Sequence, residues 1–398
     1  MLSIIVDKKA NAMSLSFTNI LETDIEATME HRFPSLNRLF DQKTPAILYP
    51  AGRLSRTAAV ALQKRGTDVL GFGDRNATLW ENLMDGLPVY SPQQIMEQYS
   101  TCSILVSTSI YDSEVCELFM NGGCQWVYPM PWLAHRLPDM FANREYKGAL
   151  EAVANPRNHD AINHAYRLFA DEESRRTFAS KIEYLLTFEK RCLDEIYSRK
   201  QIYFDPEILQ LSDQEVVLDG GAFNGDTLEM FLEISKGVFK EYHAFEPDSG
   251  SFALLQQKAS VDPKRIFPVR CGLADQPGTL RFISTSAFDS QFAGEGQQGG
   301  ESLRVISLDE YIIGRQPPTF LKLDIEGFEA SALRGATNLI AKHQPVLAIS
   351  AYHYPENLWE IPNLVHKLNP GYCLFTRHYT REIDDTVCYA IPRWRMKP

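Results

Sequence analysis

The sequence lacks the features that tie a chain to a membrane or to nucleic acid. No apolar run approaches the roughly 18 residues that a membrane-spanning helix needs, and no long run of Lys and Arg occurs. Acidic residues outnumber basic ones by 51 to 40, which gives a net charge of −11. Because contact with phosphates requires basic surface, we expect no nucleic-acid partner, and we expect no membrane partner either.

Cysteine pairing is also missing. The seven cysteines form no CxxC pair, and they lie in apolar runs such as TCSILV and YCLF. This pattern is typical of buried free thiols and argues against a disulfide framework or a zinc site. At the start of the chain, lysines follow the short apolar run of MLSIIVDKKANAMSL, which is the wrong order for a secretory signal. We therefore expect a cytoplasmic protein.

The hydrophobic pattern predicts two α/β domains joined by helices. A chain of 398 residues with 44% hydrophobic residues is long enough for two or three packed domains. Residues 1–140 are predicted to form a small Rossmann-like α/β domain, because buried strand patterns alternate there with helical segments. Residues 141–200 repeat apolar positions at helical spacing and predict a helical connector. The N-terminal strand patterns are at 45–50, 68–74, 102–109 and 125–129.

Residues 201–398 return to alternating strands and helices and predict a larger α/β domain. The last two strand patterns, GYCLFTRHY and TVCYAIP, are too close for a crossover helix and should pair antiparallel at a sheet edge. A mostly parallel sheet that ends in an antiparallel hairpin is the layout of class I methyltransferases. The other strands are expected at 215–220, 241–247, 266–273, 279–284, 319–324 and 345–353.

A strand, a glycine turn and a helix follow one another in VVLDGGAFNGDTLEMF, residues 216–231. The dinucleotide pattern GxGxxG fails, because its second and third glycines would fall on Phe223 and Asp226. The P-loop pattern fails as well, because no lysine follows Gly225. What remains is an acid followed by glycines, which suits a nucleotide without phosphate. S-adenosylmethionine, with an ammonium, a carboxylate and a positive sulfur, fits that description.

The predicted cofactor residues lie at the ends of successive strands. Asp219 suits the ammonium region of the cofactor, and glycines allow a close backbone approach. Glu246 ends the next strand, where an acid accepts hydrogen bonds from ribose hydroxyls, and CGLAD is expected to border the adenine. The full set is Asp219, Gly220, Gly221, Ala222, Phe223, Gly225, Asp226, Thr227, Glu246, Pro247, Gly272 and Asp324.

Four motifs in order carry a resemblance to a known family. FDPEILQLSDQEVVLDGGAFNGDT, YHAFEPD, LKLDIEGFEASALRGA and LAISAYHYPENLWEIP closely resemble FkbM-type S-adenosylmethionine methyltransferases over residues 201–398. Members of this family mostly methylate hydroxyl groups of sugars, polyketides and similar metabolites. The resemblance implies that Asp219, Gly221 and Glu246 contact the cofactor. Phe223 stands where the family more often has tyrosine.

Methyl transfer to a hydroxyl requires that the hydroxyl lose its proton. Either a general base takes the proton, or a metal ion lowers the pKa of the hydroxyl. His353, at the end of a strand, is the first candidate for the base because imidazole titrates near neutral pH. Asp324 could orient His353 or serve as base itself, and Glu326 lies two residues further on. In the alternative, Asp324, Glu326 and His353 hold Mg²⁺ or Mn²⁺. Glu329 is interpreted as a first-turn helix acid.

The sequence therefore predicts an S-adenosylmethionine-dependent methyltransferase that acts on a hydroxyl of a sugar, a glycoconjugate precursor or a similar metabolite. Two alternatives stay open, an NAD(P)-dependent sugar-nucleotide oxidoreductase and a non-catalytic nucleotide-sensing protein. The expected partner is a small-molecule or saccharide acceptor, and self-association as a homo-oligomer is left open. Residues 286–302 are rich in Gly, Gln and Ser, and we expect there either a lid or a loose loop.

Overall fold

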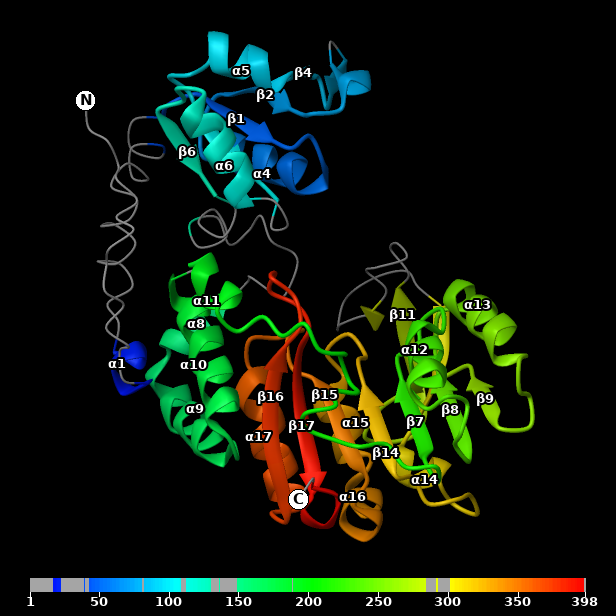
Figure 1. Ribbon diagram of the computed structural model, residues 1–398. Coiled ribbons are helices and arrows are strands. Elements are labelled where there is room, and N and C mark those ends of the chain that lie inside the picture. Colours follow the sequence, from blue (N-terminus) through cyan, green and yellow to red (C-terminus); the bar gives the residue numbers. More distant parts are fainter. Residues whose placement is uncertain are drawn as a thin grey trace.

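The computed structural model describes residues 17–22, 39, 43–80, 82–108, 112–129, 136, 149–187, 189–283, 291–292 and 301–396. Figure 1 shows an N-terminal sheet with its helices, a group of helices that follows it, and a larger C-terminal sheet. This order matches the alternation of strand and helix patterns in the sequence.

The N-terminal sheet has the strand order β3-β4-β2-β1-β5-β6, and its β1, β2, β4, β5 and β6 pairs are parallel. Residues 83–90, which lie outside the predicted strands, form a hairpin. Asp85 and Gly86, both with positive φ, make its two-residue turn, which is a common hairpin signal. The bounds are β1 Ala46–Tyr49, β2 Val69–Gly73, β3 Leu83–Met84, β4 Leu87–Tyr90, β5 Ser103–Val106, β6 Trp126–Tyr128, α4 Arg53–Lys64, α5 Pro92–Gln98 and α6 Asp112–Asn121.

A group of helices, α8 to α11, follows the N-terminal sheet and packs on the C-terminal sheet. Helix α10 contacts the edge strand β16, and α9 contacts α17. The short helix α1 also belongs to this group, because the Phe17 ring stacks on Tyr166 with centroids 4.2 Å apart. Residues 17–21 thus lie against the connector, although the sequence pattern grouped them with the N-terminal domain. The bounds are α1 Phe17–Leu21, α8 Ala149–Ala154, α9 Pro156–Leu168, α10 Glu172–Thr187 and α11 Lys190–Asp194.

The C-terminal sheet has the order β16-β17-β15-β14-β7-β8-β9. Strand β17 runs antiparallel to both of its neighbours, and the pairs from β15 to β9 are parallel. The predicted mostly parallel sheet with an antiparallel C-terminal hairpin is confirmed. The bounds are β7 Val216–Gly220, β8 Glu241–Phe245, β9 Ile266–Val269, β14 Phe320–Leu323, β15 Val346–Ser350, β16 Tyr372–His378 and β17 Thr386–Pro392.

Helices cover both faces of this sheet. Side chains of a strand alternate between faces, so Leu218 and Leu321 enter one core with α14 to α17, whereas Val217 and Phe320 enter the other with α12 and α13. The central parallel strands β7, β14 and β15 are buried along their whole length, as expected for a sheet covered on both sides. The bounds are α12 Asp226–Ile234, α13 Ser249–Ala259, α14 Leu308–Tyr311, α15 Glu329–Arg334, α16 Thr337–His343 and α17 Asn357–Leu368.

A small second sheet, with the order β10-β13-β11-β12, stands beside the large one. The strand expected at 279–284 is therefore present but belongs to this second sheet. Within the Gly-rich stretch 286–302, Gln291–Phe292 is strand β12, while residues 284–290 and 293–300 lie outside the described residues. The choice between lid and loose loop stays a prediction. The remaining bounds are β10 Gly272–Leu273, β11 Gly278–Ile283 and β13 Glu301–Ile306.

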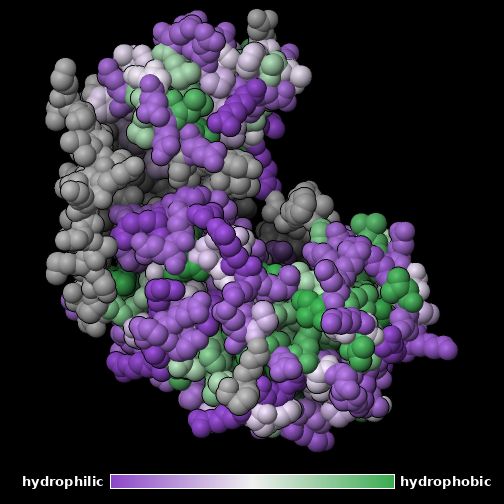
Figure 2. All heavy atoms as spheres, in the orientation of Figure 1, coloured by the Kyte–Doolittle hydropathy of each residue, from purple (hydrophilic) through white to green (hydrophobic). Residues whose placement is uncertain are grey.

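The hydrophilic surface (Figure 2) and the free cysteines agree with what the composition predicts. Figure 2 shows a largely hydrophilic face, with hydrophobic side chains gathered over the C-terminal sheet domain; exposed apolar residues of that domain include Ile234, Val238, Leu254 and Val261. The cysteines are free, and all but Cys373 are buried, as predicted. Among the residues that the structure describes, no helix is both long and apolar enough to cross a membrane.

Candidate active site

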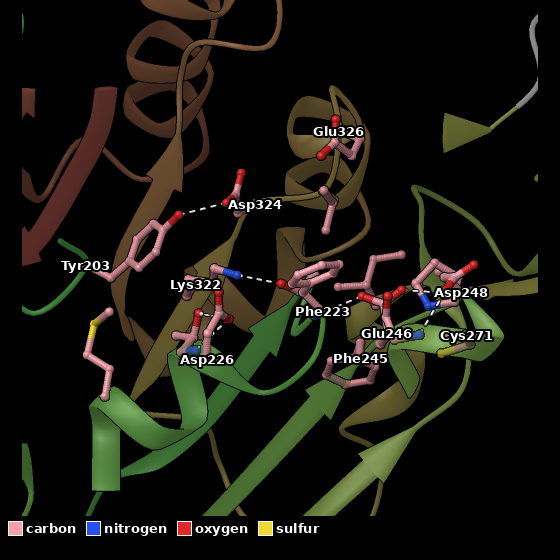
Figure 3. A pocket seen from close by; sticks show the side chains of 18 of the residues that line it. Tyr203, Phe223, Asp226, Phe245, Glu246, Asp248, Cys271, Lys322, Asp324 and Glu326 are labelled. Carbon is pink, nitrogen blue, oxygen red and sulfur yellow. Dashed lines mark hydrogen bonds between the residues drawn. The ribbon is translucent and has the colours of Figure 1, made fainter. Parts of the chain in front are cut away.

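A cavity of about 360 Å³ lies at the carboxyl ends of β7, β8 and β14. Small-molecule sites in open α/β sheets occur at this edge, and the volume falls in the usual range for them. Figure 3 shows the lining side chains converging on the cavity from both sides of the glycine turn. The predicted residues that line it are Gly221, Phe223, Asp226, Thr227, Glu246, Pro247, Gly272, Asp324 and Glu326. The other predicted residues are buried and do not line it: Asp219, Gly220, Ala222, Gly225 and His353.

The glycine turn after β7 passes directly against the end of β14. Gly221 has φ 74°, and a Cβ atom there would lie 1.8 Å from the carbonyl oxygen of Asp324. Any side chain at Gly221 would displace one of the two segments, so glycine is required by both space and backbone conformation. Phe223 follows in the left-handed region with φ 45°, and Gly225 with φ 86° precedes α12. The turn therefore holds its shape through glycine and lies open toward the cavity.

Asp219 is committed to a buried ion pair. Its Oδ1 atom lies 3.0 Å from Nζ of Lys322, and its Oδ2 atom accepts a 2.7 Å hydrogen bond from the hydroxyl of Tyr242. Burial by itself lowers the pKa of Lys322, but the carboxylates of Asp219 and Asp324 outweigh it and raise that pKa. Lys322 also donates to the carbonyl oxygen of Gly221 at 2.7 Å. Asp219 thus supports the glycine turn through Lys322, and Lys322 is the member of the pair that lines the cavity.

Glu246 is held at the end of β8 with its carboxylate beside the cavity. One carboxylate oxygen accepts from the backbone N–H of Phe223 and the other from that of Asp248, both at 2.8 Å. Burial raises the pKa of Glu246 to about 7, although these backbone hydrogen bonds oppose the rise. Each carboxylate oxygen accepts more than one hydrogen bond, so both retain capacity for two neighbouring hydroxyl groups. This arrangement fits the ribose role that the sequence predicts.

Asp324 is surrounded by donors on the other side of the cavity. It accepts from the hydroxyl of Tyr203 at 2.7 Å and from that of Tyr352 at 3.1 Å, and its Oδ1 atom lies 3.4 Å from Nε2 of His353. Burial raises the pKa of Asp324, but His353 and Lys322 outweigh it and hold the pKa below its usual value. A carboxylate with a lowered pKa and three neighbouring donors is a weak proton acceptor. Asp324 is therefore suited to fixing the charge and position of its neighbours.

His353 lies between two carboxylates. Its Nδ1 atom is 3.0 Å from Glu329, and its Nε2 atom faces Asp324. Burial alone lowers its pKa, but Glu329, Asp324 and Glu326 together raise it to about 10. The imidazole is consequently protonated at neutral pH. These carboxylates, which the sequence did not reveal as neighbours, move the pKa of His353 away from the near-neutral value on which its choice as general base was based.

Glu329 is the acid that the sequence analysis undervalued. It is fully buried, and besides facing His353 it accepts from the backbone N–H of Ile325 at 2.8 Å. Glu326, by contrast, is 55% exposed and lies 3.8 Å from His353. Among the residues that the structure describes, the side chains close enough to share a metal ion are Asp324, Glu329 and His353, whose ligand atoms lie within 4.8 Å of one another. Each nitrogen of His353 faces a different one of these two carboxylates.

Asp385 completes the cavity wall and was not predicted. It stands in the turn between β16 and β17, with φ 54°, and its side chain lines the same cavity as Asp324. The sequence signal is weak, because TREIDD is an ordinary polar turn. Only the position of that turn in the sheet brings it to the site.

Comparison with known proteins supports the fold. Residues 219–386 match the model of the methyltransferase FkbM domain. Hexuronic acid methyltransferase AglP from Haloferax volcanii is 26% identical over 164 residues, which cover 39% of this chain and 66% of AglP, just under two thirds of its length. The crystal structure of methyltransferase FkbM from Methylobacillus flagellatus KT is 24% identical, covers 94% of this chain and 98% of its own, and superposes with a TM-score of 0.76. The class I methyltransferase fold is thus confirmed, and none of these comparisons supports the oxidoreductase alternative.

Proposed function

Since residues 219–386 match the model of the methyltransferase FkbM domain, we propose that the chain transfers a methyl group from S-adenosylmethionine to a hydroxyl of a sugar, a glycoconjugate precursor or a similar metabolite. The observation that carries the proposal is the cavity at the carboxyl ends of β7, β8 and β14, with the Glu246 carboxylate fixed in its wall. A sugar acceptor is supported by the similarity to AglP, which is named for its action on hexuronic acid.

The lining residues fit the chemical groups of this cofactor. Glu246 would accept hydrogen bonds from the two ribose hydroxyls, and the CGLAD segment at Gly272 would border the base. At the opposite end of the cavity, the Asp226 carboxylate would match the ammonium group of the amino acid moiety. The sequence analysis assigned this role to Asp219, which is buried behind Lys322 and does not line the cavity. When bound, the sulfonium supplies an electrophilic methyl group whose leaving group is a neutral thioether.

Calorimetric titration with S-adenosylhomocysteine and NAD⁺ tests the cofactor. We expect micromolar binding of S-adenosylhomocysteine and none of NAD⁺, with an affinity about 100-fold lower in Glu246→Ala, because two charge-assisted hydrogen bonds are lost. Glu241→Gln, at the other end of β8, is the matched control and should bind normally. Binding of NAD⁺ in place of the sulfur compound would overturn the proposal.

The affinity for S-adenosylhomocysteine should also depend on pH. Burial raises the pKa of Glu246 to about 7, and hydroxyl donors favour the charged carboxylate. Below pH 7 the carboxyl group must first lose its proton, so binding should be about tenfold weaker at pH 6 than at pH 8. Titrations at both values, repeated on Glu246→Gln, check this. If the affinity of Glu246→Gln changes with pH as much as that of the wild type, another group causes the pH dependence.

The acceptor class is tested with a methyl-tritiated donor and a panel of free and p-nitrophenyl-linked hexoses and hexuronic acids. We expect label in at least one neutral or acidic sugar, with one equivalent of S-adenosylhomocysteine per methyl group. Normal cofactor binding without transfer to any member of the panel would overturn the sugar acceptor and leave the cofactor assignment intact.

A further inference from the structure

The carboxylates that line the cavity at the carboxyl ends of β7, β8 and β14 differ in the hydrogen bonds and ion pairs that they form. Asp324 is bound by Tyr203 and Tyr352 and faces the protonated His353. Among the described residues, no hydrogen-bond donor contacts the carboxylate of Asp385, although that side chain lines the same cavity. Unlike the Asp324 carboxylate, the Asp385 carboxylate is therefore open to accept a proton from a bound hydroxyl.

The direction of β17 explains why Asp385 reaches the site. Parallel strands present their carboxyl ends at the catalytic edge, so the loop before an antiparallel strand arrives at that same edge. Strand β17 begins at Thr386, whose carbonyl oxygen accepts from the N–H of Ala351 at 2.8 Å, directly after the end of β15. Asp385 therefore stands next to the strand end that carries Tyr352 and His353, and opposite Asp324.

The helical connector anchors the turn that carries Asp385. The buried Lys181 of α10 donates to the carbonyl oxygen of Ile383 at 2.6 Å. Two ion pairs add to it, Lys190 with Glu382 at 2.9 Å and Arg381 with Asp194 at 2.6 Å. The left-handed φ of Asp385 is one that aspartate tolerates better than most residues. Three contacts from α10 and α11 thus fix a turn that would otherwise be free at the sheet edge.

The charged groups around Asp385 come from several elements. Burial raises its pKa to about 6; the carboxylates of Asp324 and Asp384 add to the rise, and His353 and Lys181 oppose it. At neutral pH the carboxyl group is therefore mostly ionised and still basic enough to hold a proton. A general base works best with a pKa near the working pH.

We propose that Asp385 is the general base that takes the proton from the acceptor hydroxyl, and that the helical connector positions it for this step. The assignment rests on the proposed function. An oxygen of the Asp385 carboxylate forms a bond to the hydroxyl proton, and the O–H bond breaks with its electron pair left on the acceptor oxygen. That oxygen forms the new bond to the methyl carbon, and the C–S electron pair leaves with sulfur. The proton does not go to the group formed by Asp324, His353 and Glu329. That group fixes the positions of the charges around Asp385.

Asp385→Asn tests the assignment, because asparagine keeps the shape and tolerates the same backbone conformation. With the best acceptor of the sugar panel, we expect kcat to fall about 10²–10⁴-fold, with S-adenosylhomocysteine affinity unchanged within about threefold. In the wild type, kcat should fall below an apparent pKa near 6, and this acidic limb should vanish in the variant. Carbon NMR of aspartate-labelled protein gives a readout without turnover: the resonance missing in the variant should titrate near pH 6.

Asp384→Asn is the matched control, because it changes the neighbouring carboxylate, which does not line the cavity. It should keep kcat within about fivefold and move the acidic limb to lower pH, since Asp384 raises the pKa of Asp385. Three results overturn the assignment: normal turnover in Asp385→Asn, an acidic limb that persists in it, or wild-type turnover abolished by EDTA and restored by Mg²⁺. A wild type that binds no sulfur cofactor would instead overturn the proposed function itself.

Discussion

Replacing Lys322 by methionine is expected to lower the free energy of unfolding by about 3–5 kcal/mol, because it leaves the Asp219 carboxylate buried without its counter-charge. Both side chains are almost completely buried, and their charged atoms lie 3.0 Å apart. Methionine fills much the same volume, so the loss reports the charge and not a cavity. Binding of S-adenosylhomocysteine should weaken as well, because Lys322 holds the carbonyl oxygen of Gly221 in the glycine turn.

Urea unfolding of four proteins separates these effects. The double variant Lys322→Met with Asp219→Asn should recover about half of the loss, because a neutral amide costs less to bury than an unpaired carboxylate. Lys258→Met removes a partly exposed lysine paired with Glu229 at 2.9 Å and should cost less than about 1 kcal/mol. An equal loss in Lys322→Met and Lys258→Met would show that the buried pair contributes no more than a surface pair.

The second large effect is expected at His353. Replacing it by glutamine removes the positive charge between Glu329 and Asp324 and should lower the free energy of unfolding at pH 7 by about 3–5 kcal/mol. The folded-state pKa of His353 is raised to about 10, above the unfolded value near 6.5. Its contribution to stability is therefore complete below pH 6.5 and is lost as the pH rises toward 10.

Urea unfolding between pH 6 and pH 10 measures this dependence. Wild-type stability should fall across that range, and the His353→Gln variant should lose most of the slope. His243→Gln is the contrasting control, because burial lowers the pKa of His243; its contribution is present above pH 6.5 and lost as the pH falls. If the wild type and His353→Gln decline in parallel toward pH 10, then His353 is not protonated at neutral pH.

Much of the fold could be predicted because it depends on neighbours in the sequence. Buried strands read as apolar runs, and the spacing between GYCLFTRHY and TVCYAIP allowed only a hairpin. The β3–β4 hairpin was missed because Pro88 made its short strand resemble a loop. Strand β11 was identified, but its membership in the second sheet depends on pairing with β13, some 20 residues further along the chain.

Some features of the candidate site could likewise be predicted from the sequence, and others could not. The glycine turn, Glu246 and Asp324 were predicted, because strand–turn–helix motifs place their residues at one sheet edge by local geometry. The roles of the remaining groups were not, because protonation depends on contacts between distant segments. His353 changes from base to imidazolium through Glu329 and Asp324, more than 20 residues away, and no local pattern records that contact.

The sequence by itself determined the class I methyltransferase layout, the glycine turn and the acid at the end of β8, because each depends on residues that are close together in the sequence. The tertiary structure decided which acids are buried, which are paired and which face the cavity. Lys181 and Ile383 are 202 positions apart in the sequence, yet the hydrogen bond between them helps to hold Asp385 beside the carboxyl end of β15. The sequence analysis had placed His353, and not Asp385, at that strand end. Charge and burial are properties of the packed interior, where the dielectric constant is low and neighbours act strongly.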